Sequence, residues 1–321
     1  MSAETWAGIS NLTIPTATVV YVFALVSHTV EWAGSRTVAK ARPAAVLAGS
    51  GGGPAVVPAE VTEAPISWRA EAAGRVGLLL TWLAFMLHAT GVVTRGLSAG
   101  RVPWGNMYEF AISASLAVAI VYLAFERRYK LRWLGLGVTA LISAVLGLAV
   151  LTLYVPAGPL VPALDSYWLV IHVSAAAIAG GAFTVGAMAS ILYVIKSRAE
   201  QRTLAGEPMP GPLRRLPASA AIDAVAYKVH AFAFPLWTFG VLVAGPIWAE
   251  HAWGRYWNWD PKEVWSFVVW VIYAAYLHAR ATAGWRGRKA ALVAVVGWLA
   301  FLFNFVGVNL LVSGLHSYAG I

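Results

Sequence analysis

Long apolar runs separated by short polar segments dominate this sequence. Eight runs approach or exceed the roughly 20 residues that a helix needs to cross the hydrocarbon core of a bilayer. They lie at about 15–33, 76–95, 108–125, 133–154, 168–195, 222–248, 264–279 and 290–313. The pattern predicts an all-α polytopic membrane protein with eight transmembrane helices, and the even number places both termini on one side.

Composition supports this fold class and excludes several functions. Hydrophobic residues make up 60% of the 321 positions, charged residues make up 12%, and the mean hydropathy is +0.69, values that are far from those of soluble domains. The chain has no cysteine, which excludes disulfides, iron–sulfur clusters and a thiol nucleophile. Thiol chemistry would therefore have to come from a partner. The N-terminal sequence lacks a basic region and a cleavage site, so we expect the first span to be retained.

Basic residues are distributed unevenly between the two sides of the predicted bundle. The loops after spans one, three, five and seven hold all but four of the 23 lysines and arginines, and the exceptions are Arg95, Arg101, Arg255 and Lys262. The positive-inside rule then predicts that both termini are extracytoplasmic. The net charge of +9 comes from basic loop residues that orient the chain in the bilayer, so no nucleic-acid partner is expected.

The chain divides into two predicted units. Residues 1–75 comprise the first transmembrane helix and a flexible cytoplasmic linker, because 43–66 is rich in Ala, Gly and Pro without a helical period. Residues 76–321 form a transmembrane core with an external tryptophan-rich segment at 253–265. We find no internal repeat, so the sequence does not support an inverted-repeat transporter.

The tryptophan-rich segment carries the strongest functional signal. Residues 253–263 read WGRYWNWDPKE, and Trp253, Tyr256, Trp257 and Trp259 can form a flat shelf at the membrane surface that covers a large planar ligand such as a porphyrin. An interfacial aromatic belt is the alternative and explains some of these rings. Belts usually spread over several helix ends, however, and this segment is a single cluster.

Polar residues in the same segment have structural and functional interpretations. Asp260 suits a helix N-cap, with Pro261 at the first helical position and Glu263 completing a capping pattern. Arg255 and Lys262 are two of the four extracytoplasmic cations, and they could pair with carboxylate arms on a ligand.

Three histidines are candidates for metal binding. His172 and His316 lie near the outer ends of spans five and eight, at the predicted height of the shelf, where neutral imidazoles could bind haem iron. Alone, each would more often be a tolerated interfacial polar group. His278 follows Glu263 by about 22 Å of helical rise, so it lies near the cytoplasmic side and is either an inner binding site or snorkels beside Arg280. His28, His88, His230 and His251 receive no assigned role.

At this point the sequence resembles the CcsA (ResC) family of cytochrome c synthase subunits. The resemblance covers most of the chain from His88 onward, and its most specific part is WGRYWNWDPKEVWSF at 253–267. Four further segments agree: residues 103–110, the SYWL sequence before His172, YLHAR at 276–280 and GVNLLVSGLHSY at 307–318.

The resemblance implies a function and partners. His172 and His316 would be the two external axial ligands of haem iron, acting by positioning with no acid or base residue, and His278 would meet haem on its way out. Haem b would be both substrate and bound ligand, with ferrous iron. The partners would be a CcsB/ResB-type membrane subunit, apocytochrome c, an extracytoplasmic thiol-reducing thioredoxin-like protein and the lipid bilayer.

The chain would then be the catalytic half of a holocytochrome c synthase in a bacterial plasma membrane, with its active site on the extracytoplasmic face; a thylakoid location is less favoured. It would export haem and present it for thioether attachment to a Cys-x-x-Cys-His segment. Three alternatives remain: a haem exporter that delivers to a chaperone, as in CcmC or CcmF, a solute transporter without haem, and a quinone-reactive oxidoreductase subunit.

Overall fold

A computed structural model describes residues 1–34, 46–47, 55–56, 67–158 and 165–316. Its elements, in chain order, are α1 (Ala3–Ala33), β1 (Val46–Leu47), β2 (Ala55–Val56), α2 (Trp68–Ala99), α3 (Met107–Tyr129), η1 (Arg132–Leu134), α4 (Gly135–Leu148), η2 (Ala149–Leu153), α5 (Tyr167–Leu204), α6 (Gly211–Arg214), α7 (Ser219–Trp237), η4 (Thr238–Ala244), α8 (Gly245–Trp253), α9 (Pro261–Thr282), α10 (Arg288–Leu302), η5 (Phe303–Gly307) and α11 (Val308–Leu311). The two short strands pair antiparallel.

The prediction of eight transmembrane helices is confirmed. The described residues contain eight helical segments that are long and apolar enough to cross a bilayer. Several extend beyond the apolar runs, because capping side chains continue the helix past the hydrophobic stretch. The Ser2 and Ser67 hydroxyls accept hydrogen bonds from backbone amides in the first turns of α1 and α2, which begin at Ala3 and Trp68.

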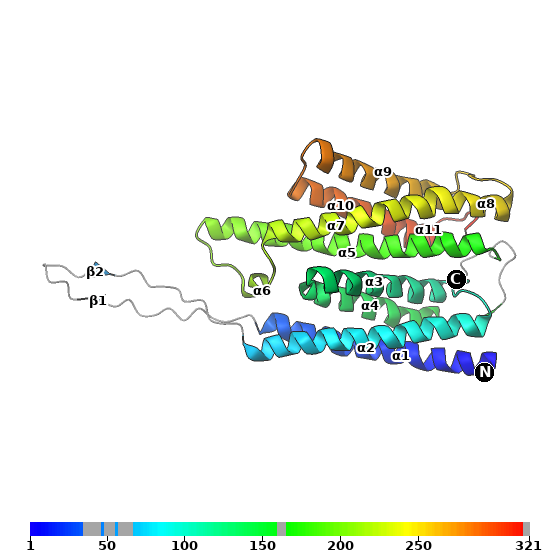
Figure 1. Cartoon of the computed structure of the whole chain (residues 1–321), viewed down its shortest axis with the longest axis horizontal. Helices are drawn as coiled ribbons and strands as arrows, with labels where there is room; N and C mark the ends of the chain where they lie inside the picture. The colour runs from blue at the N-terminus through cyan, green and yellow to red at the C-terminus, as the bar shows by residue number, and fades with distance from the viewer. Residues whose placement is uncertain (35–45, 48–54, 57–66, 159–164, 317–321) are drawn as a thin grey trace.

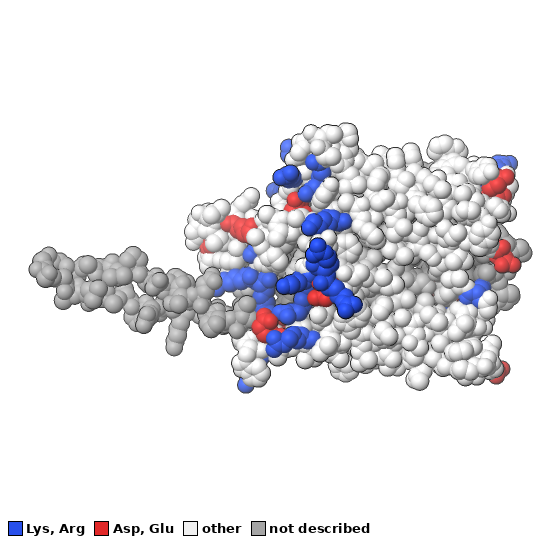
Figure 2. Space-filling view, viewed as in Figure 1, with Lys and Arg blue, Asp and Glu red and all other residues white. Residues whose placement is uncertain are grey.

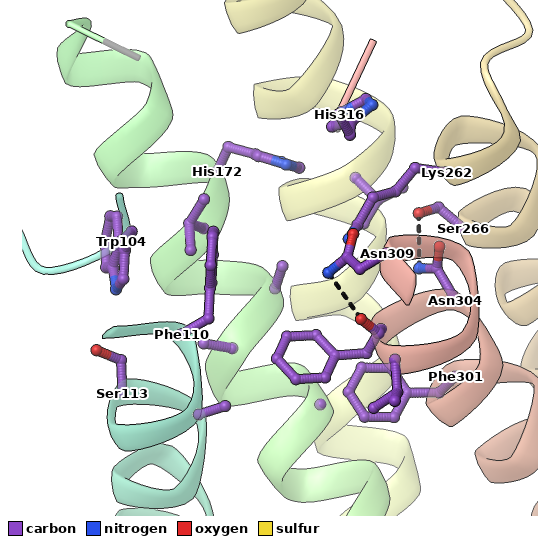
Figure 3. A pocket seen from close by; sticks show the side chains of 18 of the residues that line it. Trp104, Phe110, Ser113, His172, Lys262, Ser266, Phe301, Asn304, Asn309 and His316 are labelled. Atoms are coloured by element: carbon purple, nitrogen blue, oxygen red, sulfur yellow. Dashed lines mark hydrogen bonds between the residues drawn. The ribbon is translucent and has the colours of Figure 1, made fainter. Parts of the chain in front are cut away.

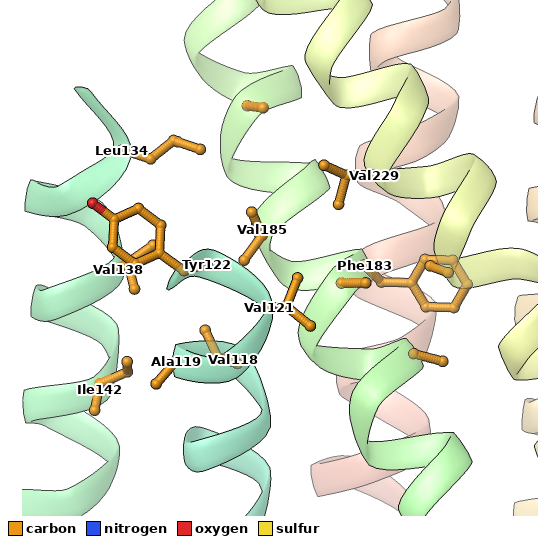
Figure 4. Close-up of a cluster of buried hydrophobic side chains, with 14 of the residues drawn as sticks. Val118, Ala119, Val121, Tyr122, Leu134, Val138, Ile142, Phe183, Val185 and Val229 are labelled. Carbon is orange, nitrogen blue, oxygen red and sulfur yellow. The ribbon is translucent and has the colours of Figure 1, made fainter. Parts of the chain in front are cut away.

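The helices run side by side along one axis (Figure 1). Helices α1 to α4 form one group, α5 and α7 to α11 form the other, and α3 packs on α5 between them. Gly181 of α5 permits this contact, since a Cβ there would lie 2.9 Å from the Ala117 backbone of α3. The buried cluster around that contact joins Val118 and Tyr122 of α3 to Val185 of α5 (Figure 4).

Charge is concentrated at one end of the bundle. Lysine and arginine side chains gather at the end of the bundle where α1 ends and α2 begins (Figure 2), and α1 begins and α11 ends at the opposite end (Figure 1). Which end of the bundle is extracytoplasmic stays a prediction from the positive-inside rule. Most of the predicted 43–66 linker lies outside the described residues.

Candidate functional site

A cavity of about 450 Å³ opens at the charge-poor end, between α3, α4, α5 and the α7–α11 group (Figure 3). Its walls are mostly apolar, and its size falls in the range typical of small-molecule and cofactor pockets. Along α5 the lining runs from Leu169 to Thr184, a helical rise of about 22 Å. The cavity is thus deep enough to receive a large apolar ligand edge-on.

His172 lies on one wall of the cavity, near the start of α5. Its Nδ1 is 2.8 Å from the Gly240 carbonyl oxygen, to which it can donate, so Nε2 is the nitrogen that would bind a metal. Gly240 belongs to η4, a π-helical segment, and such segments often occur at functional sites. The ring stacks on Trp248 of α8, with centroids 5.8 Å apart and planes 7° apart.

His316 reaches the same cavity from beyond the end of α11 (Figure 3). Its Nδ1 is 2.7 Å from Asp260 Oδ2, which again assigns Nε2 to a metal. Its ring centroid is 5.0 Å from Trp253 and 5.8 Å from Trp248. Trp248, which is 2% exposed, therefore contacts both imidazoles. The sequence analysis missed Trp248, because no spacing relates it to either histidine.

Asp260 lies behind the rim of the cavity and holds the residues around it by hydrogen bonds. Its carboxylate accepts hydrogen bonds from the backbone amides of Lys262 and Leu315 as well as from His316, and it forms a capping box with Glu263. Burial favours a higher pKa for Asp260, but the hydrogen bonds from His316 and Leu315 outweigh it and lower the pKa below 3.8. The predicted helix cap is confirmed. Asp260 does not line the large cavity, but its hydrogen-bond partner His316 does.

The tryptophan-rich segment divides between the cavity and the surface. Trp253, Tyr256 and Trp257 line the cavity, whereas Trp259 and Arg255 do not. Trp259 is 72% exposed and has a left-handed backbone with φ of 56°, which turns the chain into the Asp260 cap. Three of the four rings of the predicted shelf therefore line the cavity. Arg255, which was predicted to pair with a carboxylate of the ligand, does not line it.

Lys262 lies inside the cavity wall, where its ammonium group donates to the Asn309 side chain. It forms no ion pair within the part of the chain that the structure describes, so a carboxylate on a ligand would be its natural partner. Asn309 and the hydrogen-bonded Asn304–Ser266 pair extend the polar wall inward (Figure 3). Asn304 thus forms a hydrogen bond between η5 and α9, and Asn309 also lines the cavity.

His278 is not brought to this site. It lies on the exposed face of α9 and does not line the cavity, while its neighbour Arg280 pairs with Asp223 of α7 at 2.8 and 3.0 Å. The candidate inner site therefore faces out of the bundle.

A buried ion pair supports the cavity from the α2–α3 turn. Glu109, which is fully buried, accepts from Arg95 Nε at 2.9 Å, from Arg101 Nη1 at 2.6 Å and from the Gly105 amide at 2.7 Å. This arrangement fixes the start of α3, whose Met107 and Phe110 line the cavity.

The donor set of the cavity suits haem iron better than a bare metal ion. Among the described residues, no group of three or more His, Asp or Glu side chains could hold a metal, whereas protein sites for zinc usually supply three or four ligands. Haem iron takes four nitrogens from its porphyrin and needs only axial ligands from the protein. Two imidazoles and an apolar, partly aromatic wall fit that requirement.

Comparison with known proteins assigns the family. Residues 104–316 match the Cytochrome C assembly protein family. A protein named cytochrome c biogenesis protein CcsA from Synechococcus sp. (strain JA-3-3Ab) is 33% identical over 77% of this chain and 84% of its own length. A protein of the same name from Porphyra purpurea is 34% identical over 76% of this chain and 87% of its own.

A solved structure has the same fold. A chain titled cytochrome c haem lyase CcmF superposes with a TM-score of 0.59 and 16% identity, over 95% of this chain and 47% of its own length. The segment that matches the family, residues 104–316, begins at Trp104 on the cavity wall and ends at His316, so it contains every residue that lines the cavity. The chain belongs to the cytochrome c assembly protein family.

Proposed function

We propose that this protein binds haem as a substrate in the outer cavity and presents it for covalent attachment to apocytochrome c. The observation that carries the proposal is the convergence of His172 and His316, which are 144 positions apart in the sequence, on the same indole at the mouth of one cavity. Each ring has Nδ1 held by an acceptor, so each would direct Nε2 at iron.

Haem b fits the remaining features of the cavity. The macrocycle would contact the rings of Trp248, Trp253 and Trp257, and a carboxylate arm would pair with Lys262, the cation that lines the cavity. The rim at Tyr256, which is 61% exposed, would leave one edge of the haem accessible to a second protein.

The attachment reaction needs little from the chain beyond positioning. Each cysteine thiol of a Cys-x-x-Cys-His segment adds across one haem vinyl group: the S–H bond and the π bond of the vinyl group break, and one C–S bond and one C–H bond form. No group leaves and no net electron transfer occurs. Both thiols come from apocytochrome c, because this chain has no cysteine. Fixing haem between two imidazoles converts an encounter of mobile partners into a near-attack arrangement.

We assign the first binding of haem, near the cytoplasmic end of the bundle, to His278 together with a CcsB/ResB-type subunit. His278 lies on an exposed face, and a partner helix against that face could supply a second ligand to iron. A thioredoxin-like protein would keep the substrate thiols reduced. We propose that the outer cavity faces the extracytoplasmic side of a bacterial plasma membrane.

The proposal is tested by purifying three variants from haem-replete cells. We expect His172→Ala and His316→Ala to lose the Soret absorption and the covalent haem transfer to a co-expressed apocytochrome c. Added imidazole should restore part of the Soret absorption and part of the haem transfer. His251→Ala is the matched control, because His251 is exposed and bonds its own helix at Ile247.

Two results would overturn the proposal. A wild-type protein without bound haem would favour a transporter that does not handle haem. Full transfer by the double alanine variant would remove the two imidazoles from the mechanism.

A further inference from the structure

The inner end of the cavity is closed by side-chain packing. Phe183 of α5 stacks on Tyr273 of α9 with centroids 3.8 Å apart, and both rings are fully buried. Trp298 of α10 donates to the Thr184 hydroxyl at 3.2 Å, directly at the innermost lining of α5. Together with the backbone contact at Gly181, this packing obstructs a path for a large ligand through the middle of the bundle.

The side of the cavity, in contrast, reaches the surface within the apolar belt. Three lining residues are exposed and lie in transmembrane segments: Leu148 is 58% exposed, Val306 is 41% exposed and Leu310 is 50% exposed. Leu148 ends α4, whereas Val306 and Leu310 belong to the η5–α11 segment. Helix α4 packs on α1 and α3, and α10 packs on α9 and α5, so α4 and α10 do not pack closely on each other.

This arrangement describes a lateral opening. Four helices follow one another in the order α4, α3, α5 and α10, each contributing one face to the cavity, and the exposed lining residues lie on α4 and on the η5–α11 segment that continues from α10. The opening is bordered by aliphatic side chains at the depth of the spans, so it faces hydrocarbon rather than water.

We infer that haem enters the outer cavity sideways from the bilayer, through the opening between Leu148 and Leu310. This inference rests on the proposed function and adds the route. Haem that leaves the exposed His278 face would travel outside the bundle, because the interior below Thr184 is packed. The apolar macrocycle would pass the aliphatic border, and a carboxylate arm would pair with Lys262.

The test narrows the opening and measures the rate of haem loading. Apoprotein in proteoliposomes is mixed with vesicles preloaded with haem, and growth of the Soret band is followed. We expect the Leu148→Trp/Leu310→Trp double variant to load about tenfold more slowly, which corresponds to about 1.4 kcal/mol of added barrier, with an unchanged final spectrum. The matched controls are Leu151→Trp and Leu299→Trp, at sites that are 83% and 53% exposed and do not line the cavity. Both should load at the wild-type rate.

A second measurement does not depend on whether the tryptophan variants fold. The chain has no cysteine, so Leu148→Cys and Leu310→Cys give unique thiols in protein that is already folded. Maleimides of increasing size should slow loading progressively, and bound haem should protect both thiols from labelling.

The outcomes separate the two proposals. If wild-type protein takes up no haem from any source, the proposed function fails. If wild-type protein binds haem but the narrowed variants load as fast, or if only loading from albumin-bound haem in water is slowed, the lateral route is refuted and haem binding stands.

Discussion

The contact between Asp260 and His316 gives the sharpest prediction. Replacing Asp260 with alanine removes the carboxylate that orients the imidazole at 2.7 Å, and with it the acceptor of the Leu315 amide at 2.6 Å. A hydrogen bond to a charged group contributes about 1.5–3 kcal/mol. Loss of the outer partner of a metal-binding histidine typically weakens metal binding by about 10–100-fold. We therefore expect Asp260→Ala to weaken haem binding by about 10–100-fold.

Asp260 also caps α9, so the measurement must separate the two roles. Asp260→Ser retains an N-cap side chain of similar strength but lacks the carboxylate that holds His316. Haem titration followed at the Soret band should show both variants weakened, whereas the thermal unfolding midpoint in detergent should fall further for alanine than for serine. Removing the carboxylate also makes the imidazole a weaker donor, so the reduction potential of bound haem should rise in both variants.

A specific result would refute this reasoning. If Asp260→Ser binds haem with the wild-type affinity and potential while Asp260→Ala does not, the carboxylate acts only as a helix cap. The packing of His316 against Trp248 and Trp253 would then be enough to orient it.

Three further predictions concern neighbouring residues. Trp257→Ala should weaken haem binding in a Soret titration and Trp259→Ala should change it little, since only Trp257 lines the cavity; equal effects would contradict this. Glu109→Gln should lower the unfolding midpoint strongly, as loss of about 3–5 kcal/mol is typical when a buried ion pair loses one partner; an unchanged midpoint would show that the two arginines find other acceptors. The pKa of Asp260 is lowered in the folded protein, so the stability that its carboxylate contributes should be complete above pH 3.8 and decline as the pH falls through the lower folded value. The difference in unfolding midpoint between wild type and Asp260→Ser should therefore be constant near neutrality and shrink only in strong acid.

The sequence predicted some site residues because their signals are local. The order Asp260-Pro261-Lys262-Glu263 requires only adjacent positions to specify a helix start, and the structure has the complete capping box. The heights of His172 and His316 follow from counting residues along apolar runs. Both lie at the outer cavity, as the counting indicated.

The direction of each side chain was not readable in the same way. Trp259 and Arg255 belong to the same short segment between α8 and α9 as Trp257, yet they do not line the cavity. Trp248 has no recognisable relation to the histidines until α8 packs beside α5. His278 is exposed for the same reason, since its depth was predictable but its direction was not.

Length and apolarity of each run are properties of neighbouring residues, so the sequence by itself determined the number of spans, the charge difference between the two ends and the start of α9. The tertiary structure alone decided which side chains share the cavity, which carbonyl and carboxylate hold the two imidazoles and where the lining reaches the surface. These features depend on contacts between residues far apart in the chain. In the described part of the chain, three π-helical segments, one after α4, one between α7 and α8 and one between α10 and α11, also shift the register of the side chains that follow them, which a regular helical period does not anticipate.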